Sequence, residues 1–299
     1  MDFADMLLNR FDGEAEMKKP NSALVCFSNL ETGKTLGRLA INITRSRSEK
    51  SAITLLYFIT KAEEIRLSEE MDEYKNKIIT DFIPAEEREK IIVRLFIKSS
   101  DDYHKDIAKM AEEQKANLIL LGISNSDYNP ELIKKYSQLK NNPANSEAFI
   151  LEQFSEREVE ALKNINIVFN RNAVSTGLFI DCAITEFRKL FIPILHKEDI
   201  HIFAYLYRIA LQENVKIMIW DAIGIIGSDP KMQKLHQFIV KKTEGRVYLW
   251  NNNKKISCDF IGEQDLMIIG TDGWSKLICT PLEWTHCLPS TLIIKERTN

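Results

Sequence analysis

One stretch of the sequence, "SNLETGKTLG" at residues 28–37, has residue types that could bind phosphate groups. It follows the apolar run "ALVCF" and contains Gly33, Lys34 and Thr35, the second half of the phosphate-loop pattern G-x-x-x-x-G-K-[ST]. In that pattern the glycines let backbone N–H groups turn toward the phosphates. Ser28 stands where the first glycine is required. We therefore predict an ordinary strand-to-helix corner, with Lys34 and Thr35 in the first helical turn.

Four other residues lie at the ends of apolar, strand-like runs, where α/β sheets bind their ligands. Asn29 follows "ALVCFS", Gly122 ends "LILLG", and Gly270 and Gly273 belong to "GTDG" after "LMII". We take them as candidate ligand-binding residues. Asn29 would equally serve as a helix N-cap, and the two glycines of "GTDG" would form either an anion-binding nest or a tight turn. Asp272 between them would repel phosphate.

The cysteines and histidines show no spacing typical of a metal site or a catalytic site. His196 and His201 are five residues apart and would face different sides of a helix. No G-x-S-x-G motif or C-x-x-C pair occurs, so we predict no metal ligand, no catalytic residue and no enzyme activity. The five cysteines are predicted to be reduced and buried, with Cys287 a packed thiol; they are Cys26, Cys182, Cys258, Cys279 and Cys287.

The composition is that of an ordinary soluble protein. The 299 residues are 44% hydrophobic and 28% charged, with a net charge of -3, which argues against a nucleic-acid partner. No apolar run approaches the roughly 18 residues needed to span a bilayer. The start, "MDFADMLLNRF", lacks the basic and apolar regions of a secretory signal. We therefore expect this chain in the cytoplasm.

Short apolar runs rich in β-branched residues alternate with helix-period segments along the chain, which predicts an α/β fold with a mainly parallel sheet. Strands are expected at 22–29, 52–60, 91–98, 117–124, 175–181, 188–195, 215–222, 246–252, 265–273 and 290–296. Helical segments are expected at about 32–43, 61–79, 101–115, 198–213, 229–242 and 274–283, with one more from about residue 155, a segment that lies outside the residues described below.

The order of these elements repeats, which indicates two units of the same kind. The first strand and the glycine-ended strand start 95 residues apart in the first unit (22 to 117) and 77 apart in the second (188 to 265). The second unit is therefore shortened, and "NNNKKISCDF" is predicted to replace a crossover helix with a loop or an edge strand. The predicted organisation is an amphipathic N-terminal segment at 1–20 and two units at 21–184 and 185–299.

Two five-stranded α/β units in tandem resemble a pair of universal stress protein domains, whose fold is Rossmann-like and similar to that of the adenine nucleotide alpha hydrolases. The ATP-binding members of that family show the pattern G-x2-G-x9-G-[ST] after the fourth strand. Here the first unit has only Gly122. The second has Gly270 and Gly273, but Leu282 and Glu283 stand where Gly-[ST] is required. The resemblance therefore implies degenerate adenine nucleotide sites, and no cofactor is expected.

A narrower resemblance covers residues 22 to 296. The chain is similar to the hydrophilic C-terminal region of monovalent cation:proton antiporters, including bacterial Na+/H+ exchangers, where two degenerate stress-protein units follow a membrane domain. In that region the first unit ends in a "small-x-G-h-h-h-D" strand, and the second begins with a "(K/R)-h-h-h-P" strand and an acid-started helix. The matching residues are Ser175, Gly177, Asp181, Lys189, Pro193 and Glu198.

This resemblance implies a non-catalytic regulatory domain of a Na+ or K+/H+ antiporter, on the cytoplasmic side of the inner membrane. Its partner would be the membrane transport domain of the same polypeptide, reached upstream through residues 1–20. The last strands of paired units associate in the family, so "STGLFID" and "STLIIKE" are expected to pair, leaving other surfaces for a homodimer. The alternative is a freestanding tandem universal stress protein that binds adenine nucleotide. A P-loop phosphotransferase, which would need Lys34, is not expected.

Overall fold

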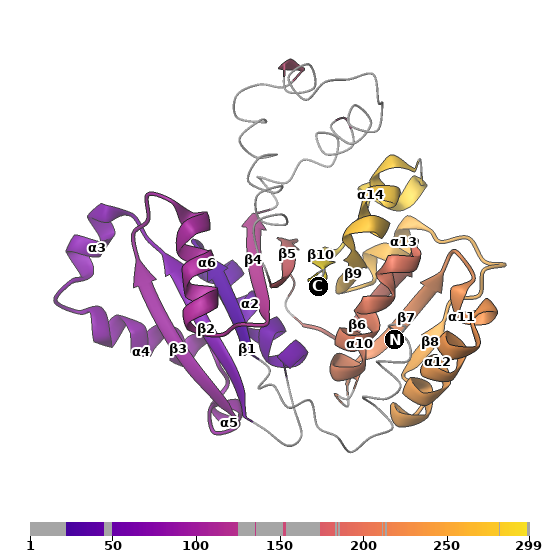
Figure 1. Ribbon diagram of the computed structural model, residues 1–299, viewed down its shortest axis with the longest axis horizontal. Coiled ribbons are helices and arrows are strands. Elements are labelled where there is room, and N and C mark those ends of the chain that lie inside the picture. The colour runs from indigo at the N-terminus through magenta and orange to yellow at the C-terminus, as the bar shows by residue number, and fades with distance from the viewer. Residues whose placement is uncertain are drawn as a thin grey trace.

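The computed structural model describes residues 22–44, 50–124, 135, 152–153, 174–182, 184, 186–210, 212, 214–280 and 282–297, and the predicted N-terminal segment at 1–20 lies outside them. The described strands form one ten-stranded sheet in the order β3-β2-β1-β4-β5-β10-β9-β6-β7-β8 (Figure 1). All paired strands are parallel except β5 and β10, so the fold is α/β with a mostly parallel sheet.

The bounds of the strands agree closely with the apolar runs of the sequence. The runs 91–98 and 175–181 are strands over the whole of their predicted lengths, and the others are shorter by a few residues at their ends. The strands are β1 (Ser22–Phe27), β2 (Ser51–Phe58), β3 (Ile91–Lys98), β4 (Leu118–Ser124), β5 (Ser175–Asp181), β6 (Lys189–Ile194), β7 (Lys216–Asp221), β8 (Val247–Leu249), β9 (Leu266–Gly270) and β10 (Ser290–Lys295).

The helices cover both faces of this sheet, so that strands such as β1 are buried along their whole length. One hydrophobic cluster takes residues from α2, α4, α10 and α12, and the other from α6, α13, α14 and η2. The helical elements are α2 (Leu30–Thr44), α3 (Lys61–Leu67), α4 (Met71–Phe82), α5 (Ala85–Arg88), α6 (Tyr103–Glu113), η1 (Lys197–His201), α10 (Ile202–Ala210), α11 (Ile225–Ser228), α12 (Pro230–Lys242), α13 (Cys258–Gly262), α14 (Thr271–Cys279) and η2 (Glu283–His286).

Three predicted elements differ from the structure. The segment 61–79 is two helices, α3 and α4, rather than one. "NNNKKISCDF" runs into the short helix α13, where Ser257 caps the first turn through the N–H of Phe260, rather than forming only a loop or edge strand. The strand predicted over 265–273 ends at Gly270, because α14 begins directly at Thr271. Gly273 therefore lies in a helix and not in a tight turn.

The two halves of the sheet have the same internal order. From each outer edge inward, the third, second, first, fourth and fifth strand of that half follow one another. The fifth strands, β5 and β10, pair antiparallel at the centre, with Leu178 opposite Ile293. Figure 1 shows both labels at the centre, between the indigo-to-magenta half and the orange-to-yellow half. The predicted pairing of "STGLFID" with "STLIIKE" is confirmed, and the described strands make one continuous sheet rather than two separate sheets of five.

Reciprocal hydrogen bonds flank this central pair of strands. Ser175 and Ser290 are the first residues of β5 and β10. The hydroxyl oxygen of Ser290 accepts from the backbone N–H of Cys182 at 2.9 Å, and that of Ser175 accepts from the N–H of Arg297 at 3.2 Å. Each donor lies seven residues after the serine of its own strand, so the two bonds are related by the same approximate two-fold symmetry as the strands.

Within the described residues, no helix combines the length and the apolar character that crossing a membrane requires.

Candidate functional site

The candidate ligand-binding residues lie at two corresponding strand ends. β1 pairs with β4 in the register that sets Ala23 beside Leu118, and β6 pairs with β9 so that Leu190 lies beside Leu266. In both halves the second residue of the first strand thus faces the first residue of the fourth strand. Gly122 and Gly270 are each the fifth residue of their fourth strand, so the two glycines occupy equivalent levels of the sheet.

At the first strand end, Asn29 caps helix α2. Its side-chain oxygen accepts from the backbone N–H of Glu31 at 2.9 Å and of Thr32 at 3.1 Å. These are donors of the first helical turn that have no partner within the helix. Asn29 is exposed, and the structure gives it the N-cap role that its residue type favours.

The partial phosphate-loop motif is helical, as predicted. Gly33, Lys34 and Thr35 lie in the first turns of α2, and the Thr35 hydroxyl donates to the carbonyl of Glu31 at 3.2 Å. Gly33 is required for packing, because a Cβ there would lie 2.6 Å from ring carbons of Phe27. The glycine therefore makes room for an aromatic ring and not for a phosphate.

Gly122 lies directly beneath helix α2. A Cβ on this residue would overlap the methyl group of Thr32 and lie 2.8 Å from the Cδ1 atom of Leu36. Thr32 and Leu36 are both buried. Side chains of α2, the helix that Asn29 caps, therefore cover Gly122 near the carboxyl end of β4. The two predicted residues of this site, Asn29 and Gly122, thus both contact the start of α2.

At the second strand end, a buried carboxylate lies against the two glycines of "GTDG". Asp199, in η1, has no exposed surface. Its Oδ1 atom accepts from the backbone N–H of Gly273 at 3.0 Å, and its Oδ2 atom accepts from the N–H groups of Leu195 at 3.1 Å and His196 at 2.9 Å. A Cβ on Gly270 would lie 3.2 Å from the Asp199 Cγ atom. Both glycines are therefore required by the approach of this side chain.

Burial and hydrogen bonding have opposite effects on the pKa of the Asp199 carboxyl group. Removal from water raises its pKa, while the backbone N–H groups of His196, Gly273 and Leu195 and the nearby ring of His201 oppose the rise. A helix N-terminus such as that of α14 offers N–H donors that favour anions. Here one of those donors, on Gly273, already binds a carboxylate of the chain itself.

His201 lies beside this carboxylate and is also buried. Its Nδ1 atom is 2.6 Å from the carbonyl oxygen of Glu198, and its Nε2 atom is 3.3 Å from the carbonyl oxygen of Ile294. The His201 ring thus lies between a carbonyl group of η1 and one of β10.

The two strand ends correspond residue by residue. Asn29 and His196 each follow the first strand of their half by two residues and cap the next helix. Thr32 and Asp199 each come three residues later and lie over the fourth-strand glycine. The same fold position therefore carries a hydroxyl in one half and a carboxylate in the other.

The sequence resemblance includes the neighbouring acid, Glu198, as the start of a helix, but Asp199 was not among the predicted site residues. Glu198 has a side chain that is 64% exposed, whereas Asp199 is fully buried. The local signal was present: an acid three residues after a capping residue is the spacing of a capping box, and His196 and Asp199 form one here. What the sequence could not show was that Gly270 and Gly273 would pack against this acid.

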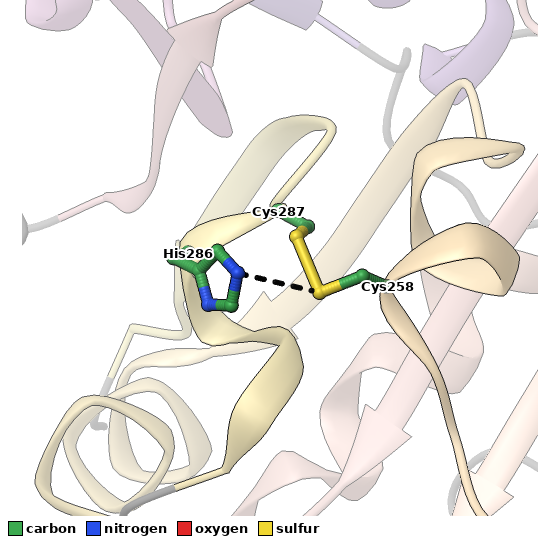
Figure 2. A group of neighbouring side chains, drawn as sticks. All are labelled: Cys258, His286 and Cys287. Atoms are coloured by element: carbon green, nitrogen blue, oxygen red, sulfur yellow. Dashed lines mark hydrogen bonds between the residues drawn. A yellow bond between two sulfur atoms is a disulfide. The ribbon is translucent and has the colours of Figure 1, made fainter.

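A second cluster, on α13 and η2, corrects the prediction for the cysteines. Cys258 and Cys287, which are 29 positions apart in sequence, form a disulfide with Cα atoms 5.6 Å apart (Figure 2). The prediction of reduced thiols was wrong for this pair, because α13 and η2 pack together although they are distant in sequence. The cysteines described as free are Cys26, which is buried, Cys182, which is exposed, and Cys279, which is partly buried.

Comparison with known proteins gives likenesses at the level of structure only. No family model matches the chain, and no curated protein matches its sequence. A universal stress protein from Archaeoglobus fulgidus DSM 4304 is similar in structure, with a TM-score of 0.49 and 10% identity over 93% of this chain and 97% of that one. A functionally unknown protein from Pseudomonas aeruginosa PAO1 has a TM-score of 0.45 and 11% identity over 94% of each chain.

Proposed function

We propose that this chain is the non-catalytic regulatory domain of a Na+ or K+/H+ antiporter, and that it consists of two universal stress protein-like units. The observation that carries the proposal is the position of Asp199. A buried carboxylate bound to the N–H of Gly273 competes with any phosphate for that donor and would repel its charge. The domain would therefore act through its surfaces and partners rather than through chemistry on a bound nucleotide.

Support for two units comes from the repeated strand order and from the reciprocal bonds of Ser175 and Ser290. In this proposal the units comprise residues 21–184 and 185–299, and the β5–β10 pair takes the place of a dimer contact between separate stress-protein chains. The units would then behave as one body, because breaking them apart would expose two strand edges.

Two of the residues that carry the sequence resemblance have specific roles in the sheet. A Cβ on Gly177 would lie 2.8 Å from a methyl carbon of Leu120 and 3.0 Å from one of Leu292, so a larger residue there would require these leucine side chains to shift. Pro193 lies beyond the part of β6 that pairs with β9, which spans Leu190 and Phe191. Proline lacks the N–H group that a strand donates to its neighbour in a sheet. At this position, beyond the paired part of β9, no such hydrogen bond to β9 is lost. These roles are consistent with the antiporter-like architecture.

Regulation requires that a ligand or partner bind two states of the transporter with different affinities. In the proposal the partner is the membrane transport domain of the same polypeptide, on the cytoplasmic side of the inner membrane. A second copy of the domain is a further candidate partner. Residues 1–20 would connect the first unit to the membrane domain.

The reading frame upstream of Met1 provides the first test of this proposal. We expect it to encode about a dozen apolar segments, each of about 20 residues. Proton flux would then be measured in membrane vesicles that contain the full-length transporter or a form truncated before this domain. The proposal is supported if the truncated form still transports protons but depends on ion concentration or pH differently from the full-length transporter. A gene that begins at Met1, or identical transport by both forms, contradicts it.

Calorimetry with ATP tests the alternative function, a freestanding stress protein that binds adenine nucleotide. We expect no binding to the isolated chain, because Asp199 and the covered Gly122 occupy the two strand ends. Binding that is lost in Gly273→Val, with the folded state preserved, would instead support a freestanding stress protein that binds adenine nucleotide. Lys34→Ala serves as the matched control, since Lys34 belongs to neither glycine site.

A further inference from the structure

The cluster formed by Cys258, His286 and Cys287 takes no part in the proposed function. Each residue contributes one metal-ligating atom, and these three atoms lie within 4.8 Å of one another (Figure 2). His286 is exposed and both cysteines are partly buried, so the cluster is accessible from solvent. Thiolate sulfur and imidazole nitrogen are the ligands that Zn²⁺ prefers.

The distances suit a tetrahedral ion. With Zn–S bonds of about 2.3 Å and Zn–N bonds of about 2.0–2.1 Å, tetrahedral geometry separates a sulfur from a nitrogen ligand by roughly 3.6 Å and two sulfurs by roughly 3.8 Å. The Cys258 Sγ atom lies 3.5 Å from the His286 Nε2 atom. These two atoms are therefore already at the separation that a shared zinc ion requires, while the two sulfurs must part from the disulfide to reach theirs.

Backbone position brings the three ligands together. Cys258 is the first residue of α13, while His286 and Cys287 lie at the end of η2. Beneath them, the buried ring of Trp284 packs on Phe191 and Trp220, with centroid distances of 5.9 Å to each. This aromatic packing holds η2 through contacts that do not involve the disulfide.

We propose that Cys258, His286 and Cys287 form a redox-gated zinc site. In the oxidised state the disulfide removes both sulfur ligands, and the protein binds no zinc at this place. In the reduced state two thiolates and one imidazole bind Zn²⁺, and the fourth coordination position is open to water. Whether the site holds a metal ion would thus depend on whether Cys258 and Cys287 are reduced or oxidised.

The chemical step is thiol–disulfide exchange with a dithiol reductant. One reductant thiolate attacks a sulfur of the Cys258–Cys287 bond and forms a mixed disulfide, and the second reductant thiol then displaces the protein sulfur. The reductant leaves as a disulfide, and each cysteine gains one electron and one proton. Binding of Zn²⁺ then releases the two thiol protons to solvent.

The test is a zinc titration of the full chain in both redox states. Protein is reduced with dithiothreitol, which is removed under anaerobic conditions, and Zn²⁺ affinity is measured by competition with a chromophoric chelator. We expect one tightly bound ion per reduced chain and none at this site in the oxidised chain. Co²⁺ should give a thiolate-to-metal charge-transfer band in the reduced protein only.

Single variants identify the ligands. Cys258→Ser, Cys287→Ser and His286→Ala should each weaken zinc binding at least about tenfold, the effect that loss of even an outer-shell partner has. Cys279→Ser and Cys182→Ser, which change free cysteines, should bind zinc like the wild type. His286→Ala leaves the disulfide intact, so it remains informative if a cysteine variant fails to fold, as circular dichroism would show.

Three outcomes would overturn the proposal. One is reduced, folded wild-type protein that binds no zinc. Another is zinc binding that is unchanged by His286→Ala and by both cysteine variants, which would place the ion elsewhere. Equal zinc affinity of the oxidised and reduced chains would likewise refute gating by the disulfide.

Discussion

The Oδ1 atom of Asp199 lies 3.0 Å from the backbone nitrogen of Gly273, which is 74 residues away in sequence. This bond joins the segment that follows β6 to the first turn of α14. The other carboxylate oxygen binds the backbone of residues 195 and 196, so one side chain fixes two chain segments against each other. Its position explains why both glycines of "GTDG" are needed.

Removing the Asp199 carboxylate should destabilise the fold. Asp199→Ala leaves one buried and two partly buried N–H groups without their acceptor, and we expect a loss of about 2–3 kcal/mol in the free energy of unfolding. Urea denaturation followed by circular dichroism measures this change. Glu198→Ala is the matched control, since its exposed side chain should contribute within about 0.5 kcal/mol. Equal losses in the two variants would contradict the role given to Asp199.

A methyl group at Gly122 should be poorly tolerated. Gly122→Ala forces overlap with Thr32 and Leu36, and we expect a destabilisation of about 1–3 kcal/mol. Thr32→Ser removes the methyl group that is overlapped, so the double variant should recover part of the loss.

The control for this prediction is Gly227→Ala in α11, because a Cβ there meets nothing within 4 Å. Its stability should be unchanged or up to about 1 kcal/mol higher, since alanine favours helix over glycine. Thermal denaturation of the four proteins compares the changes directly. If Thr32→Ser fails to improve Gly122→Ala at all, the packing argument is wrong.

The reciprocal serine bonds should have similar strengths. Ser175→Ala and Ser290→Ala each remove the acceptor for one backbone N–H at the β5–β10 junction, and loss of that bond should cost about 1 kcal/mol in each; Ser175→Ala also removes a side-chain hydrogen bond with Tyr205. Ser275→Ala, on the exposed surface of α14, is the control and should change stability by less than about 0.5 kcal/mol. The prediction fails if only one of the two junction variants differs from the control in chemical denaturation.

His236 should make stability depend on pH. Burial lowers its pKa, Asp221 partly opposes this effect, and its Nε2 atom is buried with no hydrogen-bond partner among the described residues. The unfolded chain, with a histidine pKa of about 6.5, binds the proton first. The free energy of unfolding should therefore fall as pH decreases from about 6.5 through the lower folded-state pKa. His236→Phe should reduce this slope in urea titrations at several pH values, and an unchanged slope would contradict the assignment.

Much of the fold could be predicted because parallel strands covered on both faces are continuous apolar runs. "IIVRLFIK" and "STGLFID" are strands over their whole predicted lengths. Errors occurred where local pattern is ambiguous. The apolar run "LMIIG" gave no sign that a helix would begin at the next residue, Thr271, because "TDG" is equally typical of a turn.

The candidate sites were less predictable, since each depends on contacts between distant segments. Asn29 and Gly122 are 93 residues apart (29 to 122), and Thr32 connects them: its backbone N–H donates to Asn29, and its methyl group lies over Gly122. The Cys258–Cys287 bond was missed because the spacing of cysteines does not specify pairing. In each case the residue types were visible in the sequence, but their partners were not.

The sequence by itself determined the α/β class, the repeated order of elements and the first-turn position of Lys34 and Thr35. These follow from local periodicity and from the absence of a first loop glycine, which do not depend on distant residues. Only the tertiary structure decided that Asp199 would lie against Gly270 and Gly273, and that Cys258 would meet Cys287. Such contacts arise from the packing of helices on a shared sheet, which brings together segments that no sequence spacing relates.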